Sequence, residues 1–156
     1  VEQIGNYCFS ECTSLKNIII SSKLKVISKG AFRGCSSLTE IIIPSSVTNI
    51  EEEAFSSCLS LKEIVIPNSV MSIGDNAFSI CIAATKVTLS DSLKSIGSCT
   101  FYGCSSLKFV SIPSSLTSIG DNAFYECSSL NEVLIPSSLK SIGNHSFPDE
   151  TKITNK

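Results

Sequence analysis

The chain has 156 residues, a length that usually corresponds to one domain. Its net charge is −2 and only 17% of its residues are charged, so no strong field would attract nucleic acid or an anionic membrane surface. No apolar run approaches the roughly 18 residues that a membrane-spanning helix requires, and no signal peptide is recognisable at the start. We therefore expect neither a nucleic-acid partner nor membrane insertion by this segment.

Several residue types recur every 23 positions along the chain. The cysteines of this repeat are Cys12, Cys35, Cys58, Cys81, Cys104 and Cys127. The phenylalanines are Phe9, Phe32, Phe55, Phe78, Phe101, Phe124 and Phe147. The isoleucines are Ile4, Ile27, Ile50, Ile73, Ile96, Ile119 and Ile142. Such columns, in phase from end to end, indicate stacked repeats, and a period between about 20 and 29 residues points to leucine-rich-repeat coils.

Each repeat predicts three segments in chain order, here taken from the repeat that starts at Cys58. Residues 61–66 are rich in β-branched residues and alternate at their end, which predicts a short strand ended by Pro67. Residues 70–73 predict a second short extended segment, and we expect Gly74 to mark a sharp bend. The stretch 75–81 predicts a tight or helical turn that returns the chain to the next coil. The glycine recurs in later repeats as Gly97, Gly120 and Gly143.

One coil cannot bury its apolar edge alone, whereas stacked coils share a continuous core and pair their strands in parallel. The sequence therefore predicts a β-rich repeat solenoid of 23-residue coils, with a parallel sheet and short turn or helical segments. We expect one domain, 1–156, of about seven coils, with a cut N-terminal end and a polar C-terminal tail or cap at 148–156. The coil 81–103 departs from the pattern, because Ala84 and Ser90 replace leucine and proline, so we expect a local irregularity there.

The repeat C-S-S-L-x-x-I-x-I-P-S-S-L-x-S-I-G-D-N-A-F-x-x-C closely resembles the BspA-like, or Treponema-type, class of leucine-rich repeats. The resemblance covers residues 4–147 in nearly seven copies. It implies a cell-surface or secreted protein of a bacterium or protozoan parasite that adheres to host proteins, to matrix or to other microbes. It provides no catalytic residues and fixes no ligand, because the shared positions are structural.

The cysteines give little sign of metal or disulfide chemistry. Neighbouring members of the column lie one strand spacing apart, about 4.8 Å, and point the same way, which fits a disulfide poorly. We expect a buried row of free thiols, with occasional disulfide pairs as the alternative. Cys8 and Cys99 form close pairs with column cysteines, but four coils separate these pairs, so one zinc ion cannot join them. We expect no metal site and no cofactor.

The remaining candidate groups also favour structure over catalysis. His145 is the only histidine, and without an evident nucleophile and acid around it we interpret it as a surface residue. Asp75 and Asp121 share a column two coils apart, where turn formation explains them. Asn144-His145-Ser146 matches a glycosylation sequon, which matters only if a eukaryote secretes the protein. The sequence therefore predicts a protein that is not an enzyme.

The most informative positions flank the first isoleucine of the predicted strand, because they should point away from the core. The first column of candidate partner-binding residues is Asn17, Glu40, Glu63, Lys86, Phe109 and Glu132. The second column is Ile19, Ile42, Val65, Thr88, Ser111 and Leu134. The second column is mostly apolar, and an exposed apolar stripe bordered by charge often marks an interaction surface. The alternative is that β-branched residues there only favour the strand.

Three functional hypotheses follow. The first is a surface-exposed binding or adhesion module whose sheet face engages a host matrix protein or another cell-surface protein. The second is an intracellular scaffold that uses the same face, which free thiols in a reducing compartment would suit. The third is a structural spacer or self-assembling repeat that forms homo-oligomers as its ends stack. Every hypothesis assigns the molecule a binding or structural role.

Overall fold

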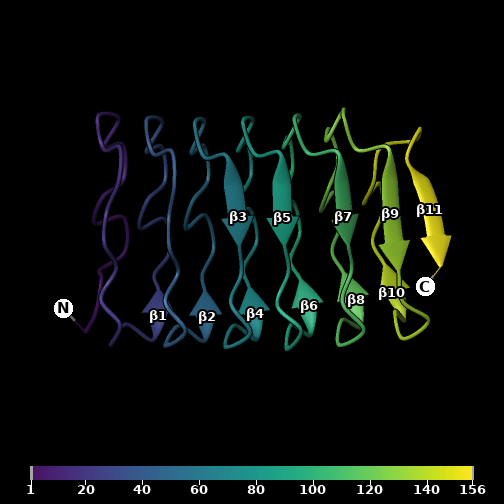
Figure 1. Cartoon of the computed structure of the whole chain (residues 1–156), viewed down its shortest axis with the longest axis horizontal. Coiled ribbons are helices and arrows are strands. Elements are labelled where there is room, and N and C mark those ends of the chain that lie inside the picture. The colour runs from purple at the N-terminus through teal and green to yellow at the C-terminus, as the bar shows by residue number, and fades with distance from the viewer. Residues whose placement is uncertain (1, 156) are drawn as a thin grey trace.

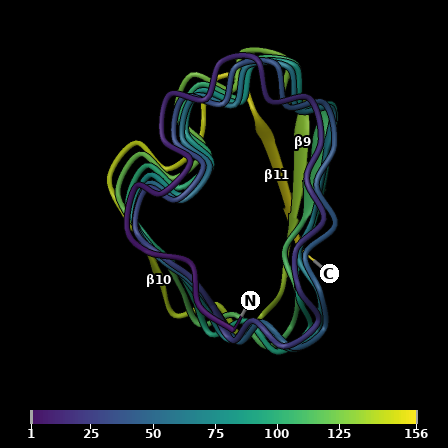
Figure 2. The ribbon, with the colours of Figure 1, turned by 90° about the vertical axis from the view of Figure 1, so that its left-hand side faces the viewer.

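The computed structural model describes residues 2–155, so the two ends of the predicted domain 1–156 lie outside the described residues. It is a solenoid in which successive coils stack along one long axis (Figure 1). Seen along that axis, the coils superimpose as a closed outline (Figure 2). Among the described residues all regular elements are strands, and no helix that could cross a membrane is present.

One continuous parallel sheet runs along one side of the solenoid and takes one strand from each of six successive coils. Each pairing joins residues one repeat apart, as in Ile27 with Ile50 and Ile96 with Ile119. These strands come from the second extended segment of each repeat. They are β1 (Val26–Ile27), β2 (Asn49–Ile50), β4 (Ser72–Ile73), β6 (Ser95–Ile96), β8 (Ser118–Ile119) and β10 (Ser141–Ile142).

The first extended segment of each repeat forms the other row of strands in Figure 1, and this row is interrupted. Its strands are β3 (Glu63–Val65), β5 (Lys86–Thr88), β7 (Phe109–Ser111), β9 (Glu132–Ile135) and β11 (Lys152–Asn155). β3 pairs with β5, and β7 pairs with β9 and β9 with β11, all in parallel, but no ladder joins β5 to β7. The break follows the degenerate coil 81–103, where the sequence predicts an irregularity. Segments 17–20 and 40–43, predicted as strands, are not assigned as strands.

The last strand does not follow the 23-residue step. β11 pairs Lys152 with Glu132, so the chain reaches its partner three residues early. In Figure 2, β11 accordingly lies inside the outline of the other coils. The terminal ring, Phe147, is only 8% exposed, whereas Phe9 at the opposite end is half-buried.

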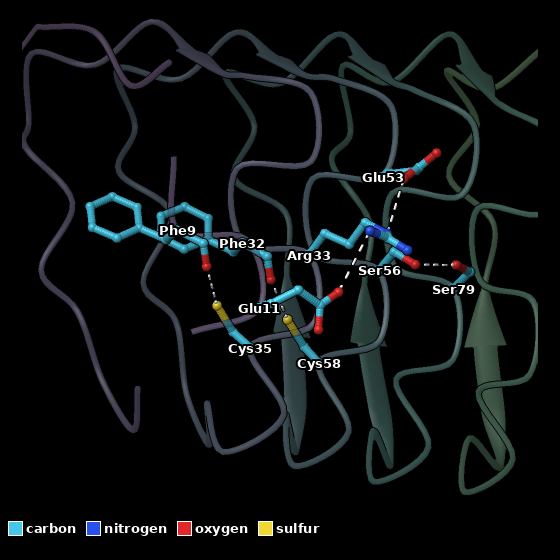
Figure 3. A network of polar contacts seen from close by, with 9 residues as sticks. All are labelled: Phe9, Glu11, Phe32, Arg33, Cys35, Glu53, Ser56, Cys58 and Ser79. Carbon is cyan, nitrogen blue, oxygen red and sulfur yellow. Dashed lines mark hydrogen bonds and ion pairs between the residues drawn. The ribbon is translucent and has the colours of Figure 1, made fainter. Parts of the chain in front are cut away.

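The core is built from the repeat columns that the sequence identifies. Seven phenylalanine rings stack face to face, with centroids between 5.1 and 5.7 Å apart and planes within 13° of parallel. The cysteine column lies beside them, and all eight cysteines are free. Each buried thiol donates a hydrogen bond to a phenylalanine carbonyl in the preceding coil, as from Cys35 to Phe9 at 3.1 Å and from Cys58 to Phe32 at 3.3 Å (Figure 3).

The third segment of each repeat is a tight turn, not a helix. Most of these turns contain two residues with positive φ, such as Asn76 at 57° and Ile80 at 58°, and this left-handed conformation cannot continue a helix. It directs alternate amides toward the next coil: the N–H groups of Gly30, Phe32 and Gly34 donate to carbonyls of the following turn at 2.8–2.9 Å. The turns therefore connect neighbouring coils in the way that strands do.

That the repeat glycines mark sharp bends stays a prediction, but a left-handed backbone is not the reason for glycine at these positions. Gly74, Gly97, Gly120 and Gly143 do not have positive φ. A Cβ at Gly120 would lie 2.6 Å from the backbone nitrogen of Ser98 in the preceding coil. At these four glycines the backbone of the preceding coil approaches too closely for a Cβ to fit without a shift, whereas Ser28 and Glu51 occupy the same column in earlier coils.

Candidate functional site

The predicted partner-binding residues lie on the outer side of the interrupted strand row, which we call the outer face. The strands alternate as expected: Glu63 and Val65 are exposed on either side of buried Ile64, and Lys86 and Thr88 flank buried Val87 in the same way. The second column begins with three exposed apolar side chains, Ile19 at 96%, Ile42 at 81% and Val65 at 46%. We call Ile19, Ile42 and Val65 the apolar stripe.

The C-terminal half of the two columns is less apolar and more buried than the N-terminal half. Thr88 and Ser111 are polar, and Leu134 is half-buried beside Thr154 of β11. Phe109 remains 45% exposed and pairs in register with Glu132, which accepts a hydrogen bond from the Thr154 hydroxyl at 3.2 Å. The apolar part of the face is thus concentrated in the first three coils.

Charged side chains border the apolar stripe. Lys86 Nζ lies 2.8 Å from a carboxylate oxygen of Glu63, and this ion pair joins two neighbouring coils across the face. Asn17 and Glu40 are exposed in the same column. No ladder joins β5 to β7, so Lys86 and Phe109 do not lie on paired strands. The structure therefore does not bring the twelve candidate partner-binding residues of the two columns into one continuous sheet.

A groove of about 460 Å³ opens between the second and third coils of this face. Ile42 and Val65 line it on the apolar side, and Glu40, Lys62 and Glu63 supply its charged edge. No backbone hydrogen bond joins residues 40–43 to residues 63–66 among the bonds of the described chain, which is consistent with a recess at this point. A protruding apolar side chain of a partner could be buried there.

The cysteines offer no reactive centre within the core. Burial raises the pKa of Cys35 to about 11 and that of Cys81 to about 12, and burial also raises the pKa of Cys58. A hydrogen bond with Cys127, followed by burial, raises the pKa of Cys104. Because the thiolate is the reactive form, these thiols are poor nucleophiles at neutral pH. Among residues 2–155, no group of three or more His, Cys, Asp or Glu side chains is arranged to hold a metal ion.

The aspartates of the turns join neighbouring coils, and the histidine lies on the surface. Asp75 and Asp121 accept hydrogen bonds at 2.7 Å from the backbone N–H groups of Ser98 and Asn144 in the next coil, so they join coils. His145 is exposed and its ring lies 5.9 Å from that of Tyr125. The sequon serine, Ser146, is buried.

Two surface tyrosines were not anticipated from the sequence. Tyr102 and Tyr125 occupy the column in which Ser56 and Ser79 are buried, and their ring centroids are 6.3 Å apart. A hydrogen bond to Glu126 raises the pKa of the Tyr102 hydroxyl. The replacement of serine by tyrosine within a repeat column was the signal that could have identified them.

Comparisons with known proteins agree with this architecture. The sequence matches the family described as a BspA type leucine-rich repeat region over residues 1–93 and 72–155, in six copies. A leucine-rich repeat protein from Bacteroides ovatus is 30% identical, with a TM-score of 0.82, over 99% of this chain and 49% of its own. The leucine-rich repeat protein of T. pallidum is 32% identical, with a TM-score of 0.82, over 92% of this chain and 70% of its own.

Two further solved structures share the fold more distantly. The pneumococcal vaccine antigen PcpA is 29% identical, with a TM-score of 0.50, over 85% of this chain and 27% of its own. A leucine-rich cell surface protein from Faecalibacterium prausnitzii is 23% identical, with a TM-score of 0.60, over 88% of this chain and 59% of its own. No curated protein is similar enough to count as a match. This chain spans about half the length of the Bacteroides ovatus protein. On its repeat, its coil geometry and these matches, the chain belongs to the BspA-type leucine-rich repeat family.

Proposed function

We propose that this protein is a non-catalytic binding module that engages a protein partner, such as a host matrix protein or another cell-surface protein, through its outer face. The observation that supports the proposal is the apolar stripe, three large side chains in successive coils that are 46–96% exposed. Contiguous exposed apolar surface bordered by charge is typical of interaction sites. The family is in general a non-catalytic protein-interaction fold.

We further propose a cell-surface or secreted location. A cell surface protein and a vaccine antigen share the fold, which supports this assignment. The five buried cysteines do not argue against it, because they are shielded from solvent and need no reducing compartment to stay free, whereas Cys8 and Cys12 are exposed. Antibody labelling of intact source cells, compared with permeabilised cells, tests the assignment. Signal that appears only after permeabilisation would favour the intracellular scaffold.

The binding surface is tested by a triple variant, Ile19→Glu, Ile42→Glu and Val65→Glu, in pull-downs from host extract followed by mass spectrometry. A matched control variant, Ser45→Glu, Asn68→Glu and Ser114→Glu, adds the same charge at exposed turn positions. Circular dichroism checks that both variants fold. We expect the stripe variant to lose the partners that wild type and control retain. Equal capture by all three proteins would move the binding site away from the stripe.

A second candidate function, self-association by end stacking, is favoured by one observation. The end of the solenoid near Ile4 and Phe9 has a hollow of about 230 Å³ lined by apolar side chains, among them Ile18 and Ile20. Buried against a second copy, this end would lose its contact with water. Sedimentation velocity over a hundredfold range of concentration tests the idea, and a constant monomer mass would exclude it.

A further inference from the structure

The turns of the C-terminal half present exposed aromatic rings in a row. Tyr102 and Tyr125 come from successive coils, and the ring of His145 follows beside Tyr125. Tyr125 is 36% exposed, His145 is exposed and Tyr102 is half-buried. The column of the two tyrosines is occupied in the two preceding coils by Ser56 and Ser79, whose buried hydroxyls bond to each other at 2.9 Å (Figure 3). Along this column the side chains thus change from buried serines in two coils to tyrosines at the surface in the next two.

The charges of these turns are unbalanced. The four turns 75–80, 98–103, 121–126 and 144–149 contain no lysine or arginine. Their carboxylates are Asp75, Asp121, Glu126 and Asp149, and within residues 2–155 none of these takes part in an ion pair. Among the described residues, no ion pair offsets these carboxylates, and Glu126 is near enough to the Tyr102 hydroxyl to raise its pKa. We call the surface of these four turns the turn face.

The equivalent turns of the N-terminal half contain basic side chains that pair with their carboxylates. Lys29 pairs with Glu52 at 2.7 Å, and Arg33 lies between Glu11 at 3.5 Å and Glu53 at 3.2 Å. Figure 3 shows Arg33 reaching the two carboxylates from its own turn. In this half the protein supplies its own guanidinium to its acidic side chains. The turn face has the acidic partners but lacks the guanidinium.

The rings on the turn face are held in place. Tyr125 packs between Tyr102 and His145, and the nearby carboxylate of Glu126 in the next coil raises the pKa of the Tyr102 hydroxyl. A guanidinium plane stacks on such rings and can bond a carboxylate at its edge, whereas an ammonium acts as a hydrated point charge. Rings that are already ordered lose little entropy when they bind.

We propose that the turn face binds an arginine-rich peptide segment, with the guanidinium groups stacked on Tyr102 and Tyr125 and bonded to Glu126. The outer face and its apolar stripe take no part. The inference therefore stands apart from the proposed function, and either can fail without the other.

The probe is a fluorescein-labelled octapeptide of arginine, titrated with the protein at low salt and followed by anisotropy. The test variant is Tyr102→Ser with Tyr125→Ser, which installs the residue found in this column at positions 56 and 79 and leaves the net charge unchanged. We expect the variant to bind the arginine peptide roughly tenfold more weakly, because it loses two cation–π contacts. An octapeptide of lysine should bind wild type several-fold more weakly than the arginine peptide.

Two further variants complete the test. Glu126→Ser installs the residue found at Ser57 and should also weaken binding, whereas Phe109→Ser removes an exposed ring from the outer face and should leave the affinity unchanged. Circular dichroism checks the fold of each variant. If wild type and the tyrosine variant bind the arginine peptide with equal affinity, the binding is general electrostatic attraction and the proposal is overturned. Binding of the arginine peptide no tighter than that of a glycine–serine octapeptide would also overturn it.

Discussion

At the scale of single residues, the stacked phenylalanines are the largest contributors to the core. Phe78 is fully buried, with Phe55 at 5.1 Å on one side and Phe101 at 5.7 Å on the other. Because every interior ring is the neighbour of two others, the loss of one exposes two faces and leaves a cavity that the adjacent coils cannot fill without bending. Each such ring therefore stabilises two coil interfaces.

We expect Phe78→Ala to lower the free energy of unfolding by about 3–5 kcal/mol, the usual cost of deleting a buried aromatic side chain. Urea denaturation followed by circular dichroism measures the change. Phe109→Ala is the control, because Phe109 is 45% exposed and outside the ring stack, and it should cost less than about 1 kcal/mol. Similar losses in the two variants would contradict the role assigned to the stack.

We expect the buried cysteines with raised pKa values to make the protein less stable in alkaline solution. The pKa values of Cys35, Cys58, Cys81 and Cys104 are raised in the folded protein, so the unfolded chain ionises first as the pH increases. The contribution of these thiols to the free energy of unfolding is complete below the ordinary thiol pKa of about 8.5. It declines as the pH rises from there toward 11, by roughly 1.4 kcal/mol per pH unit for each thiol.

Urea unfolding in the presence of a reductant at pH 8, 9 and 10 measures this decline. Lysine and tyrosine side chains also titrate in the upper part of this range, so the double variant Cys58→Ala and Cys81→Ala serves as the control. Its stability should fall less steeply with pH than that of wild type. Identical slopes would mean that the thiols are accessible to water in the folded state.

At the scale of elements, the spacing between the later coils depends on the glycine that follows β4, β6, β8 and β10 of the continuous sheet, whereas Ser28 and Glu51 follow β1 and β2. A Cβ at Gly120 would lie within 3 Å of three backbone atoms of residues 97 and 98 in the preceding coil. Backbone atoms cannot move aside without disturbing the ladder between β6 and β8. Gly5 occupies the same column in the first coil, and a Cβ added there would have no other atom within 4 Å.

We expect Gly120→Ala to lower the free energy of unfolding by about 1–3 kcal/mol, the range for overpacking a tight interior site. Gly5→Ala should be close to neutral, because its added methyl group meets open space. Thermal denaturation of the two variants beside wild type measures the difference. A neutral Gly120→Ala would show that adjacent coils can separate at low cost.

At the scale of the whole molecule, each coil contacts its neighbours and little else, so stability should be close to a sum over coils and their interfaces. The degenerate coil 81–103 is the natural place to test this, because its removal joins Ile80 to Cys104 and keeps every column in phase. The deletion also removes β5 and β6 and makes β3 and β7 the strands of successive coils in the interrupted row.

We expect the deletion variant to fold. Its urea m-value should fall by roughly one seventh, because m scales with the surface exposed on unfolding. Circular dichroism and urea titration provide both measurements. An unfolded or aggregated variant would show that the irregular coil supplies contacts that its neighbours cannot replace.

The sequence alone determined the solenoid, its 23-residue step, its parallel pairing and the residues of its core. This was possible because a repeated coil places the same residue in the same environment many times, and burial then selects the same side chain at each position. The alternation of exposed and buried residues around Ile64 and Val87 followed from strand geometry in the same way.

The tertiary structure decided what depends on the distance between coils. Nothing within one repeat reveals that Gly120 faces the backbone of Ser98, that β5 and β7 do not pair, or that β11 reaches β9 three residues early. The same holds for the surface: Tyr102 lies beside Tyr125 and Arg33 bridges two turns because residues about 20 positions or more apart lie side by side in stacked coils. A repeat pattern specifies the coil, whereas contacts between coils depend on packing that only the assembled chain defines.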